Sequence, residues 1–300
     1  MVSVPKEYYL ISEAGRGVTA RVYFCLPAPQ VQFLAKHGPL TPDSLGFDGL
    51  RRSIVAVKVS PSKPLIGREY TALKAIQNCT VLNADAMRRH FLEVKSVGAF
   101  GGFGTAQSCV AFEAIDSPIT LADVVQECSD EVKIPIPLVY HFFLSLMPAL
   151  LFLKDGVKWA HNDIKEDNIM CRVYEGSPFD LPEFVFVDFG MAYSIEAVKD
   201  DSGDWKNLLG LLRMLAEHAE PSDDQQWLGF KRMLDGEAHR TRWQVDDEVD
   251  KIWRTWRDVA VAARSKRKMG EMSRVDDMFE RMAQRKGRVT DEIVVKAIEN

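Results

Sequence analysis

The residues most able to do chemistry lie in the stretch His161–Asn168 and in the tripeptide Asp188–Gly190 that follows it after 20 residues. The stretch reads His-Asn-Asp-Ile-Lys-Glu-Asp-Asn, and the tripeptide reads Asp-Phe-Gly. Carboxylate and amide oxygens suit a Mg²⁺ ion that is bound together with phosphates, and a lysine adds a positive charge beside them. This ordered set suits the binding of Mg²⁺ and ATP and the transfer of the γ-phosphate to a hydroxyl.

Two features upstream fit the same chemistry. Gly15 and Gly17 lie between two strand-like runs, where glycine lets the backbone approach a ligand closely and take positive φ. Lys58 ends the run Val-Ala-Val-Lys, and a lysine in an apolar strand needs a partner because its burial alone is costly. Glu69, in the next predicted helix, is the expected partner.

A strand-rich first part and a helix-rich second part must position these residues. Residues 8–25 predict two strands around a turn, residues 54–60, 92–98 and 107–114 predict three more, and residues 67–78 predict a helix. The intervening residues 26–53 are rich in proline and glycine and predict a loop or a partly ordered insertion. The second part predicts helices over residues 120–128, 137–156, 204–218, 223–235, 245–264 and 290–298.

Composition narrows the class of protein. The 300 residues are 46% hydrophobic and 27% charged, which is ordinary for one large domain or two small lobes. Residues 138–153 are apolar but short and interrupted, so we expect a buried core helix and no membrane span. The N-terminus lacks the apolar core of a signal peptide. Five scattered cysteines argue against a zinc site or a disulfide framework and favour the cytoplasm or nucleus.

The motifs quoted above resemble those of the protein kinase superfamily, and the match runs from about residue 10 to about residue 218. The resemblance implies an α+β, bilobal protein-kinase-like fold. Residues 1–115 would form a β-rich N-lobe with an insertion at 26–53, and residues 116–300 would form an α-helical C-lobe.

The resemblance also implies a nucleotide site. Gly15 and Gly17 would lie in a hairpin over the ATP phosphates, although Ala20 replaces the third glycine of the pattern. Lys58 would contact the α and β phosphates, and Glu69 would hold Lys58 in place. The alternative for Glu69 is an ordinary charge on the helix surface.

The adenine would lie against the end of the last predicted strand. By position, Phe112 resembles the gatekeeper, and the backbone groups of Glu113 and Ile115 would hydrogen-bond the adenine edge. The residues expected to sandwich the ring are Val22, Ala56 and Met170. Each of these side chains is equally compatible with an ordinary core position.

In the catalytic loop, the resemblance makes Asp163 the base that accepts or orients the hydroxyl proton, with Lys165 against the γ-phosphate. Asn168 and Asp188 would be the Mg²⁺ ligands. His161 would be structural, packed against the phenylalanine of the Asp-Phe-Gly tripeptide and against Leu73.

The pattern departs from the family in two places. Asn162 replaces the arginine that normally pairs with an activation-loop phosphate, so we expect no phosphate switch of that kind. Asp204 resembles the aspartate that ties down the catalytic loop, although a simple helix N-cap is the alternative. If the match is right, the activation segment shrinks to Met191–Gly203 and contains no Ala-Pro-Glu motif.

Three functions remain open from the sequence. The first is an active Mg²⁺/ATP-dependent kinase that acts on Ser or Thr of a protein, because Ile164–Asp167 resembles the Ser/Thr-type loop. The second is a kinase of a small molecule, which the short segment allows. The third is a pseudokinase scaffold, which the intact motif residues argue against. We expect no nucleic-acid partner, and we read the basic cluster Arg264–Lys268 as a solvated turn, with nuclear import or an acidic partner as the alternative.

Overall fold

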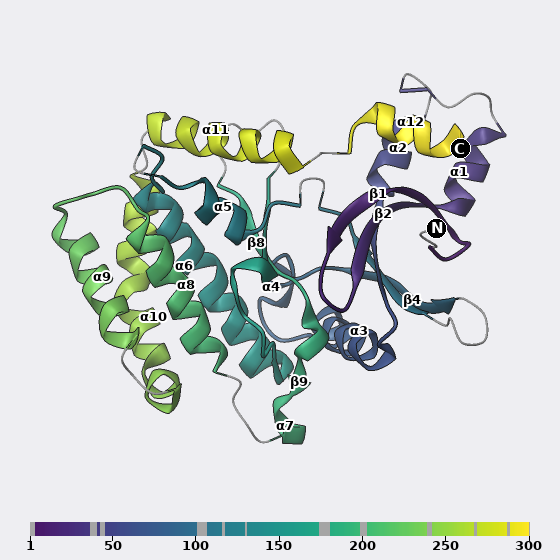
Figure 1. Ribbon diagram of the computed structural model, residues 1–300. Coiled ribbons are helices and arrows are strands. Elements are labelled where there is room, and N and C mark those ends of the chain that lie inside the picture. Colours follow the sequence, from purple (N-terminus) through teal and green to yellow (C-terminus); the bar gives the residue numbers. More distant parts are fainter. Residues whose placement is uncertain are drawn as a thin grey trace.

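The computed structural model of the chain is shown in Figure 1, coloured from the N-terminus to the C-terminus. A sheet with its helices forms one side of the molecule, and a bundle of helices forms the other. The residues that the structure describes are 4–36, 41–42, 46–100, 107–115, 118–129, 131–173, 181–198, 203–238, 242–266, 269–286 and 289–299.

A five-stranded antiparallel sheet is built from the first part of the chain, which we call the sheet part. The expected strands at each of the five places are confirmed, and the fold class is α+β. The strands lie side by side in the order β1-β2-β3-β5-β4. Their bounds are β1 Tyr8–Arg16, β2 Arg21–Pro27, β3 Val55–Ser60, β4 Val94–Phe100 and β5 Gln107–Glu113.

Alternation along the strands gives this sheet two different faces. The pairs Val22–Lys58 and Phe24–Ala56 put Lys58 on one face, which we call the inner face. Tyr23, Val57 and Val59 lie on the other, outer face and pack in a separate apolar cluster. The single charged residue within β3 therefore lies on the side of the sheet that faces helix α3 and the rest of the chain.

Helix α3 (Lys63–Asn78) packs against the inner face. Its buried side chains Ile66, Leu73 and Ile76 join Val110 and Phe112 of β5 in the main hydrophobic core. The helix begins a turn earlier than the sequence predicts, because Pro64 in its first turn favours a helix start.

The helical part follows residue 118, and its helices match the predicted segments closely. Thr120 opens α5 with a capping box to Asp123, which satisfies donors at the helix start. Helix α6 continues into a π-helical turn at Phe152–Val157. The main helices are α5 Leu121–Glu127, α6 Ile136–Leu151, α8 Asp204–Glu217, α9 Gln225–Ala238 and α10 Arg242–Ser265.

One segment, Ile136–Val157, is long and apolar enough to cross a membrane by length and composition. The apolar stretch of this segment is 72% buried inside the structure, as in the core helix of a folded protein. Rings of Tyr140 and Phe143 contact Phe230 at centroid distances of 5.1 and 5.4 Å. The expectation of a buried core helix at 138–153 is therefore confirmed.

Two short strand pairs carry the loops between the sheet and the helices. Strand β6 (Trp159–Ala160) pairs with β9 (Tyr193–Ser194), and β7 (Ile169–Arg172) pairs with β8 (Glu183–Phe186). The stretch His161–Asn168 connects β6 to β7, and Asp188 follows β8 after one residue. Strand pairing thus brings the two motif segments side by side.

The prediction of a loop at 26–53 is wrong for most of its described residues. Helices α1 (Ala28–Ala35) and α2 (Phe47–Arg52) occupy this segment. Two of the prolines that suggested a loop, Pro27 and Pro29, stand at the N-terminus of α1, where the missing N–H is harmless. Val31, Phe47 and Leu50 are buried in a cluster with residues far along the chain, which local sequence cannot show.

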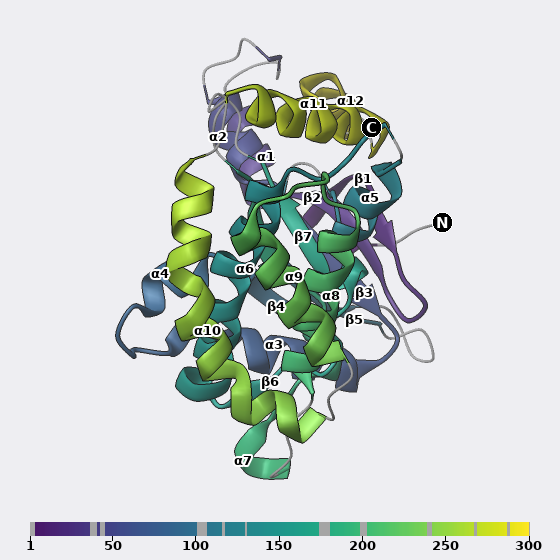
Figure 2. The same ribbon diagram turned by 90° about the vertical axis from the view of Figure 1, so that its left-hand side faces the viewer.

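Four further helices complete the described chain. They are α4 Ala84–Arg88, α7 Ile195–Val198, α11 Met269–Lys286 and α12 Asp291–Glu299. Helices α11 and α12 run along one side of the molecule, from the helical part to the sheet part (Figures 1 and 2). The sequence predicts α12 but not α11. The basic cluster falls at the end of α10, and its residues 267–268 lie outside the described chain.

Candidate functional site

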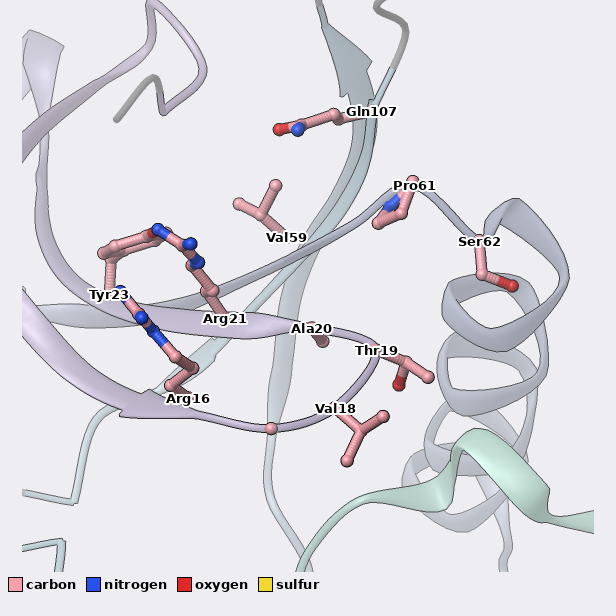
Figure 3. Close-up of a pocket in the computed structure, with 11 residues that line it drawn as sticks. Arg16, Val18, Thr19, Ala20, Arg21, Tyr23, Val59, Pro61, Ser62 and Gln107 are labelled. Carbon is pink, nitrogen blue, oxygen red and sulfur yellow. The ribbon is translucent and has the colours of Figure 1, made fainter. Parts of the chain in front are cut away.

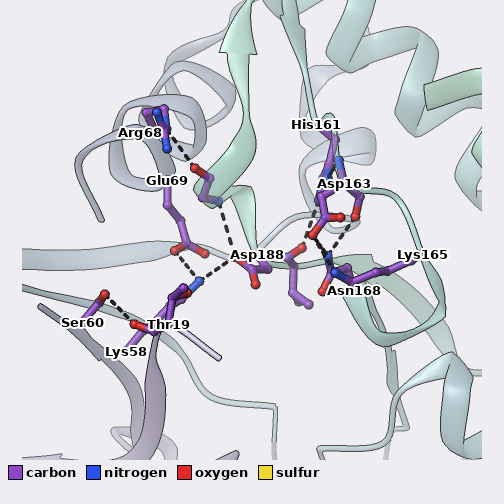
Figure 4. A network of polar contacts seen from close by, with 12 residues as sticks. Thr19, Lys58, Ser60, Arg68, Glu69, His161, Asp163, Lys165, Asn168 and Asp188 are labelled. Atoms are coloured by element: carbon purple, nitrogen blue, oxygen red, sulfur yellow. Dashed lines mark hydrogen bonds and ion pairs between the residues drawn. The ribbon is translucent and has the colours of Figure 1, made fainter. Parts of the chain in front are cut away.

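Lys58 is the centre of a polar network on the inner face of the sheet (Figure 4). Its Nζ atom lies 2.7 Å from Glu69 Oε2 and 2.7 Å from Asp188 Oδ1. Glu69 is only 1% exposed and reaches Lys58 from α3, while Asp188 comes from the segment after β8. The expected Lys58–Glu69 ion pair is confirmed, and the alternative of a surface Glu69 is wrong.

The charges of this triad are strongly coupled. Burial alone would lower the pKa of Lys58, but the carboxylates of Glu69 and Asp188 outweigh it and raise that pKa. Burial alone would raise the pKa of Asp188, but the Lys58 ammonium keeps it below its ordinary value. Burial raises the pKa of Glu69 against the pull of Lys58. A second cation or a phosphate at this place would therefore change the balance of all three groups.

Residues of the loop His161–Asn168 form the neighbouring part of the network. Asp163 Oδ2 accepts hydrogen bonds from Lys165 Nζ and from Asn168 Nδ2, each at 2.8 Å. Asn168 Nδ2 also donates to the Asp163 carbonyl at 2.8 Å, so its amide oxygen remains available as a ligand. The hydrogen bond from Lys165 to Asp163 raises the pKa of the lysine. Asp163, Lys165 and Asn168 thus lie together as predicted.

Asp204 fixes the backbone at the start of the loop His161–Asn168. Its two carboxylate oxygens accept from the N–H groups of His161 and Asn162, at 2.7 and 2.9 Å. The N-cap of α8 is Gly203, so the alternative of Asp204 as a simple N-cap is wrong. Asn162 has φ 62°, a left-handed conformation that asparagine tolerates better than most residues.

His161 is fully buried and has a structural environment. Its ring lies 4.4 Å from the ring of Phe189, as predicted. Asp163 N–H points to Nδ1 at 3.3 Å, and Nε2 lies 3.0 Å from the Val187 carbonyl, which fits a neutral ring protonated at Nε2. Burial lowers the pKa of this imidazole and keeps the ring neutral.

The segment that contains Asp188 is also held by backbone contacts. Asp188 itself has φ 63°, an uncommon conformation for a residue other than glycine. Arg68, beside Glu69 on α3, donates from Nε to the Gly190 carbonyl at 2.9 Å. Asn162 Nδ2 donates to the Met191 carbonyl at 3.3 Å. A guanidinium and an amide side chain therefore hold this segment through its main-chain carbonyls.

The glycine-containing hairpin joins β1 to β2. Neither Gly15 nor Gly17 takes a positive φ, so the expected conformational reason for glycine does not apply at either position. A Cβ at Gly15 would meet nothing within 4 Å, and one at Gly17 would make an ordinary contact. Gly15 pairs with Val22, which pairs with Lys58, so the strand register places the hairpin beside the lysine. Glycine also lets a ligand approach the backbone closely, and at this hairpin that stays a prediction.

The residues predicted to bind adenine lie near the row of paired residues Gly15, Val22 and Lys58. Phe112 and Ile115 are buried, and Phe112 pairs with Ala56 across β3 and β5. The Glu113 N–H donates to the Glu93 carbonyl at 2.9 Å, so this donor is not open to a ligand. The expectation that backbone groups of Glu113 and Ile115 hydrogen-bond the adenine edge therefore stays a prediction, in which Glu113 would use its carbonyl. Met170 lies on β7 and bridges to Thr120.

The cavity shown in Figure 3 does not coincide with this network. Its volume is about 840 Å³, and its lining includes Tyr23, Val59 and Gln107. These three side chains belong to the outer face of the sheet, opposite Lys58. Gly17 is the one predicted site residue among its lining. The cavity is thus a feature of the hairpin's other side.

Sequence reasoning missed three residues in this region. Arg68 holds the segment after Asp188, and Arg172 binds Glu113 at 2.7 Å. Ser60 is buried and hydrogen-bonds the hairpin. Only Ser60 had a signal in the sequence, since it is the one polar side chain besides Lys58 in an apolar strand.

No family model matches the chain, and no curated protein matches it with significant similarity. The geometry of the site is therefore the basis for the proposed function.

Proposed function

We propose that this chain is a Mg²⁺/ATP-dependent phosphotransferase with the bilobal fold of the protein kinase superfamily. It moves the γ-phosphate of ATP to a hydroxyl, and the acceptor is a Ser or Thr of a protein. The sheet part, residues 1–115, is its N-lobe, and residues 116–300 form its C-lobe.

The observation that carries the proposal is the position of Lys58 between Glu69 and Asp188, at 2.7 Å from each. The three groups come from a strand, a helix and a loop that are far apart in the sequence. Lys58 is only 9% exposed, and burying charged groups costs desolvation free energy, so a cluster of this kind favours a functional role over a purely stabilising one. A phosphate-binding lysine held by a helix glutamate, beside a metal-binding aspartate, is such a function.

The side chains also fit Mg²⁺ and phosphates. Asp188 is about half exposed and Asn168 keeps its amide oxygen unused, so these two hard oxygen donors would hold the metal. Among the described residues no three His, Cys, Asp or Glu side chains gather in a metal site. Two protein ligands plus phosphate oxygens are what a nucleotide-bound Mg²⁺ commonly takes. When bound, the metal would neutralise charge that develops on the phosphates.

The protein's own groups then have defined tasks. Lys58 orients the α and β phosphates, and Glu69 holds Lys58. Asp163 accepts or orients the proton of the acceptor hydroxyl. Lys165, which is tied to Asp163 in the structure, turns to the γ-phosphate and stabilises negative charge in transfer. Asp204 keeps the loop in register for these contacts.

A small-molecule acceptor is the second candidate, favoured by the short segment between Asp188 and Asp204. That segment lacks the length that builds a peptide platform in ordinary protein kinases. The protein's five cysteines are free, which supports the proposal that it works in the cytoplasm or nucleus.

The test is transfer of label from γ-labelled ATP with Mg²⁺, to the enzyme itself or to generic acceptor proteins. Wild type is compared with Asp163→Asn and with Asp167→Asn, an exposed aspartate of the same loop. We expect Asp163→Asn to lower the rate at least about 100-fold and Asp167→Asn to keep most of it. Mg²⁺-dependent ATP binding without protein labelling would favour the small-molecule acceptor. Equal activity of wild type and Asp163→Asn would refute the proposed base.

A further inference from the structure

Ser60 is a buried hydroxyl at the end of β3, two residues after Lys58. It is 1% exposed and lies in a strand whose other non-lysine residues are apolar. Nothing in the proposed phosphotransfer uses it. A buried hydroxyl is costly without hydrogen bonds, so the hydrogen-bond partners of Ser60 indicate its structural role.

One hydrogen-bond partner of Ser60 lies in the hairpin, and the other lies at the start of α3. Its Oγ atom donates to the Thr19 carbonyl at 2.7 Å and accepts from the Ser62 N–H at 3.0 Å. Ser62 is the N-cap of α3, the helix that carries Glu69. Figure 4 shows the bond from Ser60 to Thr19 beside Lys58. One hydroxyl thus joins the hairpin tip, the lysine strand and the glutamate helix.

At the hairpin tip, which Ser60 holds through the Thr19 carbonyl, several backbone N–H donors are free. Gly17 N–H closes the turn by donating to the Ala20 carbonyl at 2.9 Å. Within the described chain, the N–H groups of Val18, Thr19 and Ala20 have no hydrogen-bond partner. Successive free N–H groups in a turn attract phosphate oxygens, and the bond to Thr19 limits how the turn can move.

We propose that Ser60 is a positioning residue that holds the glycine-containing hairpin in place over the phosphates of the nucleotide. The inference rests on the proposed function, since it assigns a positioning residue to the same nucleotide site. It does not place Ser60 in contact with the nucleotide. Loss of the hydroxyl would free the hairpin tip and remove the acceptor of the Ser62 N–H, whereas the Lys58–Glu69 ion pair does not involve Ser60.

The experiment separates phosphate recognition from adenine recognition. The dissociation constants of ATP with Mg²⁺ and of adenosine are measured for wild type, Ser60→Ala and Ser53→Ala by calorimetry. Ser53 is a matched control, because its hydroxyl also donates to a carbonyl, that of Leu50, but in α2. We expect Ser60→Ala to weaken ATP about two- to tenfold, the range of one hydrogen bond, and to leave adenosine binding unchanged. Ser53→Ala should change neither.

Other outcomes decide against the inference. Equal weakening of ATP and adenosine by Ser60→Ala would mean a general structural role, and no weakening of ATP would mean no role. If Ser60→Ala does not fold, Ser60→Cys has the same shape with a larger atom and a weaker donor, and it should show the same selective loss. Wild type that binds neither ligand would overturn the proposed function itself, whereas wild type that binds both and a Ser60→Ala that matches it would overturn this inference alone.

Discussion

At the scale of single residues, the buried charges of the candidate site are the most informative groups. Lys58 is surrounded by Glu69 and Asp188, and the charge of each depends on the others. A buried ion pair is strongly destabilising when one partner is removed, but replacing both by apolar residues can be nearly neutral. Stability and activity should therefore respond differently to single and double substitutions here.

We predict that Lys58→Met lowers the free energy of unfolding by about 3 kcal/mol, because Glu69 is then buried without its cation. The double variant Lys58→Met with Glu69→Met should regain most of this loss and still transfer no phosphate. Urea unfolding and the labelled-ATP assay measure the two quantities. Additive effects of the two substitutions on stability would contradict the pairing.

Two buried histidines predict the response to acid. Burial lowers the pKa of His90 and of His161 below their ordinary value of 6.5. As the pH falls below about 6.5, the unfolded chain binds protons before the folded chain does, so the free energy of unfolding falls until the folded-state pKa values are passed.

We therefore expect the melting temperature to fall between pH 7 and pH 5, and the fall to be smaller in His90→Gln. His90 is the better site for this test because its Nδ1 contacts the Phe184 carbonyl at 2.8 Å, away from the candidate catalytic groups. A pH profile of His90→Gln as steep as that of wild type would exclude His90 as a source of the effect.

At the scale of elements, pattern predicted the strands and most long helices but not the helices of the proline- and glycine-rich segment. The β-branched run of β3, the long apolar run of α6 and the three-to-four spacing of α8 are local features of the sequence. Helices α1 and α2 are short, and their stability comes from packing against α12 at the other end of the chain. Helix α11 was missed because its sequence is strongly charged. Cationic residues of α11 pair with Glu127 and Asp123 of α5, which are distant in sequence.

The position of α12 gives a prediction at this scale. Val294 is fully buried between the sheet and α1 and α2, and Asp291 pairs with Arg51 at 2.8 Å. Val294→Ala should lower the free energy of unfolding by about 2 kcal/mol, because it leaves a cavity. Val261→Ala, at a 42% exposed position of α10, is the matched control and should cost less than about 0.5 kcal/mol. Equal small effects would mean that α12 is not part of the core.

At the scale of the whole molecule, the site depends on three connections that meet at one place. Strand register aligns Gly15, Val22 and Lys58 in one row. Helix α3 brings Glu69 to that row, and the strand pairs β6–β9 and β7–β8 bring the loop of Asp163 and the segment of Asp188. Helices α11 and α12 then join the helical part to the sheet part along one side (Figure 2).

The sequence by itself determined the residue types of the candidate site and the order of most elements. Asp163, Lys165, Asn168 and Asp188 have the residue types that phosphotransfer needs, and their spacing is local enough to be read directly. Tertiary structure alone decided the pairings that the sequence did not predict. The contacts of Lys58 with Asp188 and of Ser60 with Thr19 join residues that are 130 and 41 positions apart. Such pairings join segments that meet only when the sheet and helices have packed, so the residues around either partner do not reveal them.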